Sequence, residues 1–450
     1  MPGEVITLQT GQCGNQVGLE YWNELTQEHG ILPDGTKEAS PSTPSSRLEH
    51  GRPDLFFTVS ETNRYIPRSI LIDLEPSVIS KSMNKMPMFN PRNVHLSEQG
   101  NGAANNWQQG YSYGLSNQDE LIDLIDREVD KCDNLSTFQI FHSVAGGTGS
   151  GVGSLLLELL NDRFGKKIIT TFSVFPSNER TSDVVVQPYN TVLTLKRLID
   201  FSNGTFVFDN DSLNSIENTL YGMKETSAFE GTNKLISFVS ASVSNPLRFP
   251  SYMYSSYESI MSTLVPTPDL KFITSSLAPS ASSMNEHDNL LELLNDKYKM
   301  NRVEGIEKPK YISVIDYLIP GGKYNSNNNS EINKGILKSQ SRLEFVPWTA
   351  NSVSVILGNK GCRKDPKFAG IQISNNTSIA TVFAKILRQY DLLAKREAYI
   401  NYYTENNSNE ERGRIMEIFN ECKESILGTI DEYKGCQYAN YLDDNDDDMI

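Results

Sequence analysis

The stretch from Gly146 to Ser154, Gly-Gly-Thr-Gly-Ser-Gly-Val-Gly-Ser, has the composition of a phosphate-binding loop. It follows the apolar, β-prone run Phe138–Val144 and precedes Leu155–Leu160, a run typical of a buried helix. Glycines let the backbone approach an anion closely, and the N–H groups and dipole at a helix N-terminus favour negative charge. We therefore expect a phosphate at this junction, with the hydroxyls of Thr148 and Ser150 as additional donors.

The same loop does not fit two common classes of nucleotide site. No Gly-Lys-Ser/Thr follows it, so it is not a P-loop of the Walker type. Its glycines fall at every second position from Gly147 to Gly153, which does not match the dinucleotide fingerprint G-x-G-x-x-G. A flexible linker is the alternative, but linkers rarely lie between an apolar strand and an apolar helix.

Two earlier stretches carry side chains suited to a phosphate and its metal ion. Gly11–Gln16 is another glycine-containing entry to a helix, where we expect Gln12 to contact phosphate or a metal-bound water. Cys13 is expected to pack near the ligand, because no basic partner is evident that would make it a nucleophile. Asp73 and Glu75 follow a strand and predict a magnesium ion held through water, with helix capping as the alternative.

Later segments predict contacts to the sugar and base of a nucleotide. Gly100–Trp107 is rich in glycine and asparagine, and Asp183 is placed to accept from a ribose hydroxyl. Asn210 closes a further strand. Phe229 and Asn233 are spaced i, i+4, which puts both on one face of a helix, where a ring can stack on a purine and an amide can recognise its edge. A core role for Phe229 is equally consistent with this spacing.

The elements that must position these loops alternate along the chain. In the first half, strands separated by helices predict a mostly parallel sheet with helices on both faces, and ligands bind such sheets beyond the carboxyl ends of the strands. The second half is mixed and then helical. The predicted strands are Glu4–Gln9, Ser69–Leu74, Phe138–Val144, Ile168–Val174, Thr205–Asp209, Leu270–Thr274, Tyr311–Leu318 and Ser352–Leu357, and the predicted later helices are Ala228–Val243, Ser378–Tyr403 and Glu411–Tyr433.

Composition limits the possible classes of protein. The chain has 450 residues, 38% hydrophobic and 22% charged, which is typical of a soluble protein with two or three domains. No apolar run approaches the roughly 20 residues of a membrane span, and the N-terminus has no signal-peptide pattern. A net charge of −15 argues against general nucleic-acid binding and favours basic protein partners. Five scattered cysteines without zinc-ligand spacing predict reduced thiols in the cytosol.

Three segments are expected to lie on the surface. They are Lys37–Pro53, Gly321–Asn333 and the Asp-rich 443–448.

Taken in order, these motifs resemble those of the tubulin superfamily, whose signature is matched by Gly146–Gly151. Three stretches are more similar to the gamma-tubulin family than to alpha or beta chains: Tyr65–Arg68, Ser182–Asn190 and Phe345–Trp348. The many asparagines are typical of a yeast member. The resemblance implies an α/β, tubulin-like fold. Its expected parts are a GTP-binding domain with a parallel sheet at 1–227, a core helix at 228–248, an intermediate α/β domain at 249–377, and C-terminal helices with an acidic tail at 378–450.

The implied ligand is GTP or GDP, with Mg2+ held through water by Gln12, Asp73 and Glu75. Ala104 departs from the family, which often has glycine before the following asparagine pair, in the loop expected near the γ-phosphate. The resemblance implies that Asn210 and Asn233 recognise guanine and that Phe229 stacks on it. The expected nucleotide contacts are Gln12, Cys13, Asn105, Gly146, Gly147, Thr148, Gly149, Ser150, Asp183, Asn210, Phe229 and Asn233.

The implied function is nucleation of microtubules at a microtubule-organising centre or spindle pole body. The implied partners are gamma-tubulin complex proteins, alpha/beta-tubulin dimers and lateral gamma-tubulin neighbours, with no nucleic acid and no membrane insertion. Tyr254 and Ser256 replace an Asn-x-Asp pair of alpha and beta chains, and Ser259 stands where alpha chains have a catalytic Glu. Glu258 is one residue off, about 100° away around a helix, so we expect at most slow GTP hydrolysis. The alternatives are a self-polymerising GTPase and, more distantly, a dinucleotide-dependent oxidoreductase.

Overall fold

The computed structural model describes most of the chain. Asp183, the segments 38–50 and 321–328 within the expected insertions, and the acidic tail lie outside the described residues. The described residues are 3–37, 51–97, 100–176, 184–221, 229–249, 253–280, 285–301, 308–319, 329–359, 361–362, 368–404 and 409–442.

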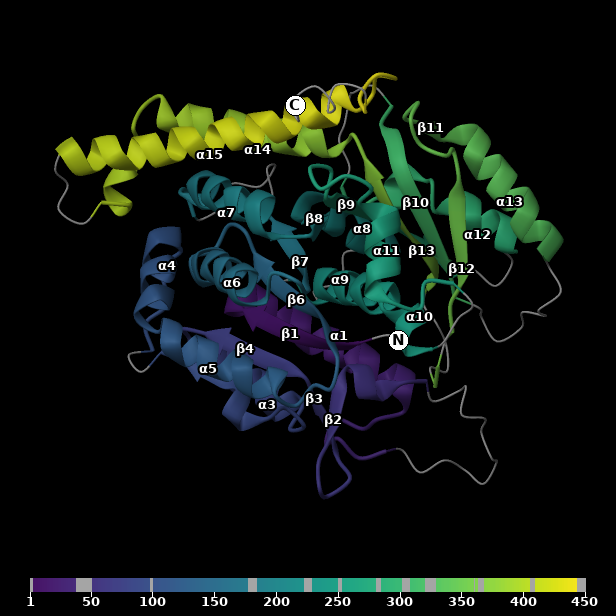
Figure 1. Ribbon diagram of the computed structural model, residues 1–450, viewed down its shortest axis with the longest axis horizontal. Helices are drawn as coiled ribbons and strands as arrows, with labels where there is room; N and C mark the ends of the chain where they lie inside the picture. The colour runs from purple at the N-terminus through teal and green to yellow at the C-terminus, as the bar shows by residue number, and fades with distance from the viewer. Residues whose placement is uncertain are drawn as a thin grey trace.

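The first half forms a parallel sheet in the order β8-β7-β6-β1-β4-β5, with a small antiparallel pair beside it (Figure 1). The five strands predicted in this half are confirmed with small shifts at their ends, whereas the short β2, β3 and β5 were not predicted. The strands are β1 (Glu4–Thr10), β2 (Phe57–Val59), β3 (Tyr65–Pro67), β4 (Ser69–Asp73), β5 (Val94–Leu96), β6 (Leu135–Ser143), β7 (Ile168–Phe175) and β8 (Gly204–Asp209).

Helices cover both faces of this sheet, as the alternating pattern predicts. Alternate strand residues face opposite sides, so Ile140 packs toward α6 and α7 while Phe141 packs toward α1 and α9. The helices of this half are α1 (Gly11–His29), α3 (Pro76–Lys85), α4 (Trp107–Ser116), α5 (Gln118–Val129), α6 (Thr148–Phe164), α7 (Gln187–Phe201) and α8 (Asn210–Tyr221).

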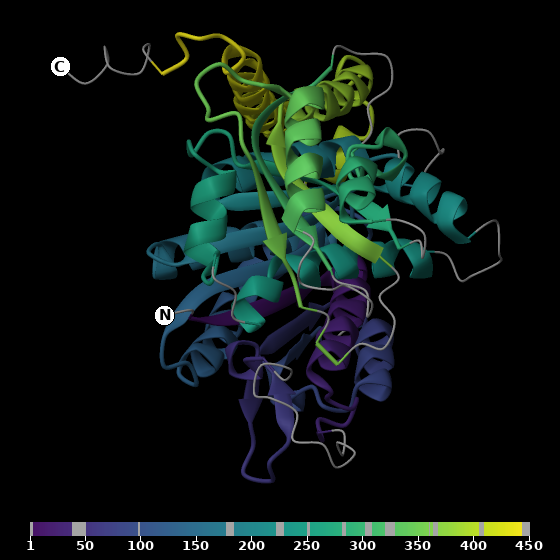
Figure 2. The ribbon, with the colours of Figure 1, turned by 90° about the vertical axis from the view of Figure 1, so that its right-hand side faces the viewer.

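The second half continues the same sheet, which the sequence did not predict. A short parallel ladder, Thr205 to Phe272 and Phe206 to Ile273, joins β8 to β9, so the described residues form one 11-stranded sheet. Figure 2 shows α13 on the outer side of the added strands, opposite the core helix α9. The elements are β9 (Phe272–Pro279), β10 (Lys310–Leu318), β11 (Glu344–Phe345), β12 (Val353–Leu357), β13 (Phe368–Asn376), α9 (Glu230–Val243), α10 (Asn245–Arg248), α11 (Tyr257–Leu264), α12 (Glu286–Glu292) and α13 (Asn329–Arg342).

Two long helices, α14 (Ile379–Ala394) and α15 (Asn409–Gly435), lie across α7 as an outer layer (Figure 1). The prediction of one helix over Ser378–Tyr403 is wrong, because Glu397 and Tyr399 have left-handed φ values of 46° and 62° that a right-handed helix cannot contain. A short 3-10 helix, Ile400–Tyr402, follows instead.

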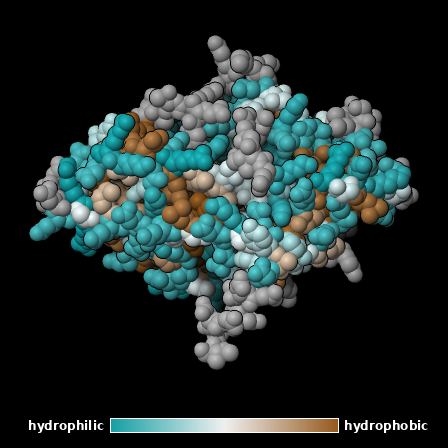
Figure 3. Space-filling model, turned by 90° about the horizontal axis from the view of Figure 1, so that it is seen from above, coloured by the Kyte–Doolittle hydropathy of each residue, from teal (hydrophilic) through white to brown (hydrophobic). Residues whose placement is uncertain are grey.

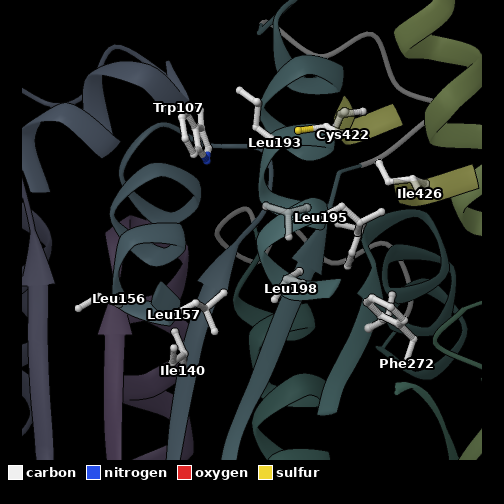
Figure 4. Close-up of a cluster of buried hydrophobic side chains, with 14 of the residues drawn as sticks. Trp107, Ile140, Leu156, Leu157, Leu193, Leu195, Leu198, Phe272, Cys422 and Ile426 are labelled. Carbon is white, nitrogen blue, oxygen red and sulfur yellow. The ribbon is translucent and has the colours of Figure 1, made fainter. Parts of the chain in front are cut away.

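The core runs without a break from the sheet into this outer layer. Figure 4 shows buried side chains of β6, α6 and α7 in one cluster with Cys422 and Ile426 of α15, and Leu193 and Leu195 of α7 lie nearest to these two residues. Seen from above, over α14 and α15, the surface is mainly hydrophilic with separate hydrophobic patches (Figure 3). No helix within the described ranges is long and apolar enough to span a bilayer.

Candidate nucleotide-binding site

The glycine-rich loop connects the end of β6 to the first turn of α6. The N–H of Gly151 donates to the carbonyl of Gly147 at 2.9 Å, which is the first hydrogen bond of that helix. The N–H groups of Thr148, Gly149 and Ser150 precede this bond and have no acceptor within the helix. Three successive amide donors therefore stand at a helix N-terminus beyond the carboxyl end of a parallel strand, as a phosphate site requires.

The glycines of this loop allow three chain segments to meet. A Cβ on Gly147 would lie 2.8 Å from the Ala103 Cβ and from the amide nitrogen of Asn106. A Cβ on Gly11, whose φ is 73°, would lie 2.7 Å from the amide nitrogen of Gly149. By contrast, a Cβ on Gly146 would meet no atom within 4 Å, so this residue faces open space. The loops at Gly11, Ala103 and Gly147 thus converge, and Gly146 lies where a further atom can approach them.

Ser150 differs from the role expected of its hydroxyl. The side chain is buried, and its Oγ donates to the carbonyl oxygens of Gly146 and Gly147. The hydroxyl therefore holds the loop in shape, and only the backbone N–H of Ser150 remains as a donor for a ligand. Thr148 is half-buried at the start of the helix.

His142 supports the loop from beneath and was not predicted. Its Nδ1 lies 3.1 Å from the carbonyl oxygen of Gly149, so this nitrogen carries the proton, while Nε2 accepts from the Ser173 hydroxyl at 2.8 Å. Burial lowers the pKa of His142 to about 4, so the ring is neutral at physiological pH. The pattern Phe-His-Ser in a buried strand was the only sequence signal for it.

The first loop presents one exposed and one half-buried side chain. Gln12 is exposed at the start of α1, where an amide can reach a ligand. Burial raises the pKa of the Cys13 thiol to about 12, which is consistent with packing and inconsistent with a reactive thiolate. The amide of Asn15 donates to the carbonyls of Gly11 at 2.9 Å and Ile72 at 3.1 Å, so it ties this loop to the end of β4.

Asp73 is the predicted metal residue with the most suitable surroundings. Its Oδ1 accepts from the N–H groups of Leu74 at 2.8 Å and Glu75 at 3.4 Å. Its Oδ2 is buried and accepts no hydrogen bond from the described residues, and burial raises its pKa to about 6. Glu75 is exposed, with its carboxylate against Gly102. An unpartnered buried oxygen fits a carboxylate that acts on a cation through water.

Asn105 is held in place by Asn190, a residue for which the sequence motifs predicted no such role. Ala104 and Asn105 are exposed and left-handed, with φ values of 45° and 55°. The buried amide of Asn190 donates to the carbonyls of Asn105 at 2.7 Å and Ala145 at 2.9 Å, and its Oδ1 accepts from the N–H of Trp107 at 2.9 Å. Asn190 thereby fixes two nucleotide loops relative to each other, which depends on tertiary contacts that no local pattern reveals.

At the other end of the site, the structure corrects the argument for Phe229. This residue is the N-cap of α9 in a left-handed conformation, with φ 74°, so it does not share a helical face with Asn233. The residue is 52% exposed, which excludes the core role and leaves it available to a ligand. Asn233 is half-buried one turn into α9, Asn210 is half-buried at the start of α8, and Gly231 packs against Glu217 of that helix.

The loop after the core helix carries no acid at the position of the catalytic Glu. Ser256 is the N-cap of α11 and accepts from the N–H of Ser259 at 3.3 Å, while the Ser259 hydroxyl donates to the Ser256 carbonyl at 2.7 Å. Glu258 is exposed and accepts from the Ser136 hydroxyl at 3.2 Å. Tyr254 is left-handed, with φ 58°, and its hydroxyl donates to Ser354 Oγ at 3.0 Å. Residues 250–252 of this loop lie outside the described part of the chain.

Two family models match most of the chain. Residues 4–218 match the GTPase domain of the Tubulin/FtsZ family, and residues 268–388 match the tubulin C-terminal domain. The first match makes this part of the chain a guanine-nucleotide-binding domain.

Relatives that match nearly the full chain are gamma chains of tubulin. The tubulin gamma chain of Candida albicans is 58% identical, with 99% of this chain and 94% of the relative covered. Tubulin gamma chains of Eremothecium gossypii and Saccharomyces cerevisiae are 42% and 37% identical, with 99% and 100% of this chain and 95% and 97% of the relatives covered. The chain is therefore a member of the gamma-tubulin family within the tubulin superfamily.

Proposed function

We propose that this chain nucleates microtubules by presenting a fixed, nucleotide-loaded face to alpha/beta-tubulin dimers. In this proposal gamma-tubulin complex proteins hold the face that carries the loop after the core helix, here called the lower face. Copies of the chain lie side by side as lateral neighbours, and the assembly sits at a microtubule-organising centre such as the spindle pole body. The chain acts by binding and positioning, and it turns GTP over slowly at most.

The single observation that carries this proposal is the loop that follows the core helix. In a stacked tubulin lattice this loop would face the nucleotide of the subunit below. Here position 259 is a serine bonded to its own helix cap, and Glu258 is bonded to Ser136 on β6. A template whose lower face meets an adaptor protein has no need of a hydrolytic carboxylate there. The same loop disfavours the alternative of a self-polymerising GTPase.

The nucleotide itself is proposed to bind across the carboxyl ends of the parallel strands. The amides of Thr148, Gly149 and Ser150 would bind its phosphates, together with the loops of Gln12 and Asn105. Asn210 and Asn233 would recognise guanine, and Phe229 would stack on it. When bound, Mg2+ would neutralise phosphate charge, and Asp73 would orient its water ligands. Among the described residues no three histidine, cysteine, aspartate or glutamate side chains form a direct metal cluster, so the phosphates and water would supply most ligands.

Nucleation is tested by assembly of the purified chain with gamma-tubulin complex proteins and measurement of alpha/beta-tubulin polymerisation. The expected result is a shorter lag and more microtubules than with the complex proteins alone. The same preparation, without alpha/beta-tubulin, is assayed for phosphate release across protein concentration. Phosphate release that rises steeply with self-assembly of this chain would overturn the proposal in favour of a self-polymerising GTPase.

A further inference from the structure

Residues 395–404, which connect α14 to α15 and are here called the strap, form hydrogen bonds to the nucleotide loops. The strap belongs to the outer helical layer, yet the Asn106 amide donates to the Tyr402 carbonyl and the Tyr403 hydroxyl donates to Asn190 Oδ1 at 2.7 Å. The Tyr189 hydroxyl, from α7, donates to the Ala398 carbonyl at 2.9 Å. The outer layer is therefore bonded directly to residues that shape the phosphate end of the site.

Asn190 is the point where these contacts meet. Its side-chain amide holds the carbonyls of Asn105 and Ala145, and its Oδ1 accepts from both the Trp107 N–H and the Tyr403 hydroxyl. Asn190 is completely buried, and Tyr403 is 4% exposed, so water does not compete for these bonds. A movement of the Asn105 loop changes the geometry at Asn190 and, through it, at the strap.

Both partners of this junction have unusual backbones. Ala104 and Asn105 on one side, and Glu397 and Tyr399 on the other, all have positive φ values. Non-glycine residues adopt this conformation at a cost, and they keep it only where surrounding contacts hold them there. The hydrogen bonds to the carbonyls of Asn105, Ala398 and Tyr402 are among the contacts that hold these two segments in place.

The strap also has an outward face. The side chains of Tyr399 and Tyr402 are 42% and 58% exposed, and their rings lie 6.1 Å apart. A second contact joins the same loop to the outer layer, where Arg197 of α7 lies over the Trp107 ring and approaches Cys422 Sγ of α15 (Figure 4 shows Trp107 and Cys422). The strap thus has two exposed aromatic side chains on the segment that is bonded to the nucleotide loops.

We propose that Tyr403 and Asn190 are positioning residues that link the strap to the phosphate end of the nucleotide site. The inference rests on the proposed placement of the nucleotide. By reciprocity, a bound phosphate that orders the Asn105 loop stabilises the strap, and a strap held in this position raises the affinity for nucleotide.

The test uses two buried tyrosines of one aromatic cluster, of which Tyr403 has a hydroxyl bonded to described residues and Tyr390 does not. Y403F removes the 2.7 Å bond to Asn190 and a longer 3.5 Å bond to the Val186 carbonyl, and it keeps the ring. Y390F is the matched control, because Tyr390 is equally buried in the same aromatic cluster and its hydroxyl makes no hydrogen bond to the described residues. Y403F is expected to weaken GTP binding about three- to tenfold, the range of one neutral hydrogen bond, and Y390F by less than about twofold.

Hydrogen exchange supplies a readout that a purely structural role would not move. In the parent chain and in Y390F, amides of 395–404 are expected to exchange more slowly with saturating GTP than without nucleotide, and in Y403F this difference should disappear at equal saturation. Unchanged GTP affinity in Y403F, or an equal exchange difference in both variants, overturns the link.

G147A separates failure of the link from failure of the site. A Cβ at Gly147 collides with Ala103 and Asn106, so this variant should lose GTP affinity whether or not the strap is coupled. Weak binding in G147A together with parent-like binding in Y403F overturns the link and keeps the site. Parent-like binding in G147A overturns the proposed site itself.

Discussion

The two ends of the core helix α9 are built in opposite ways. At its start, Phe229 is left-handed and half-exposed, and Asn233 lies one turn further on. Beyond its end, Arg248 is completely buried and donates to Glu28, to the Ala241 carbonyl at 2.6 Å and to Ser244 Oγ at 3.0 Å. One end leaves polar and aromatic groups available, whereas the other satisfies its charge within the chain.

This difference separates binding from stability. Groups at the start of α9 can satisfy their hydrogen-bonding capacity with a ligand, so their loss should reduce affinity and leave the fold intact. Groups around Arg248 join α1, α9 and the chain before β13, because Cys362 also donates its N–H to the Glu28 carbonyl at 2.8 Å. Their loss should reduce stability whether or not nucleotide is present.

The largest expected effect is beyond the C-terminal end of α9, at Arg248. R248M removes the cation that faces the buried Glu28 carboxylate, and loss of one member of a buried ion pair costs about 3–5 kcal/mol. Denaturant unfolding of the nucleotide-free chain measures this change. The control R52M removes an exposed pair with Asp54 and should cost less than about 1 kcal/mol. Equal effects of the two variants would contradict the contrast between the ends.

At the N-terminal end of α9, N233A should weaken GTP binding by about 1–3 kcal/mol, the cost of a lost buried hydrogen bond to the base. The free energy of unfolding without nucleotide should change by less than about 1 kcal/mol. K234A is the matched control on the same helix, since Lys234 pairs with Glu230 at 2.7 Å on its outer side. GTP affinity equal in N233A and K234A would remove Asn233 from the site.

A smaller, pH-dependent effect is expected at Asp73. Burial raises the pKa of Asp73 to about 6, so protonated Asp73 contributes to the stability of the metal-free chain at low pH. That contribution to the free energy of unfolding is lost as the pH rises through about 6. Only the ionised form acts on Mg2+. D73N should therefore reduce the Mg2+-dependent gain in GTP affinity about tenfold at pH 7, the lower end of the effect of losing an outer-shell partner of a metal. The loss should be smaller at pH 5, where the raised pKa leaves most of Asp73 protonated. A loss of the same size at both pH values would contradict this role, and the exposed D54N serves as control.

The smallest expected effect is none at all. S259E places a carboxylate at the catalytic position of alpha chains, but this loop would act on the nucleotide of a neighbour. GTP hydrolysis by the monomeric chain should therefore stay at the parent rate. S262E, on the exposed side of the same helix, is the control. Faster phosphate release by monomeric S259E alone would show that the loop reaches its own nucleotide.

The parts of the fold predicted from sequence are those with strong local patterns. Apolar runs placed β1, β4, β6, β7 and β8 within a few residues, and the glycine loop fell where a helix N-terminus was expected. The strand β13 was missed because Gln372, Ser374 and Asn375 give it a polar sequence. They are buried only because Asp316, Thr274 and the carbonyls of Leu264 and Leu270 supply partners from distant segments.

The sequence by itself determined the class of fold, the family and the loops that converge on a nucleotide, because glycine spacing and apolar periodicity act over a few residues. The structure was needed to show that the Ser150 hydroxyl bonds back to its own loop and that Phe229 caps α9 in a left-handed turn, because glycine spacing and periodicity do not specify these local conformations. Tertiary structure alone decided that Asn190 joins the phosphate loops to Tyr403, which lies 213 residues away in the chain, because packing that no local pattern encodes brings the two together.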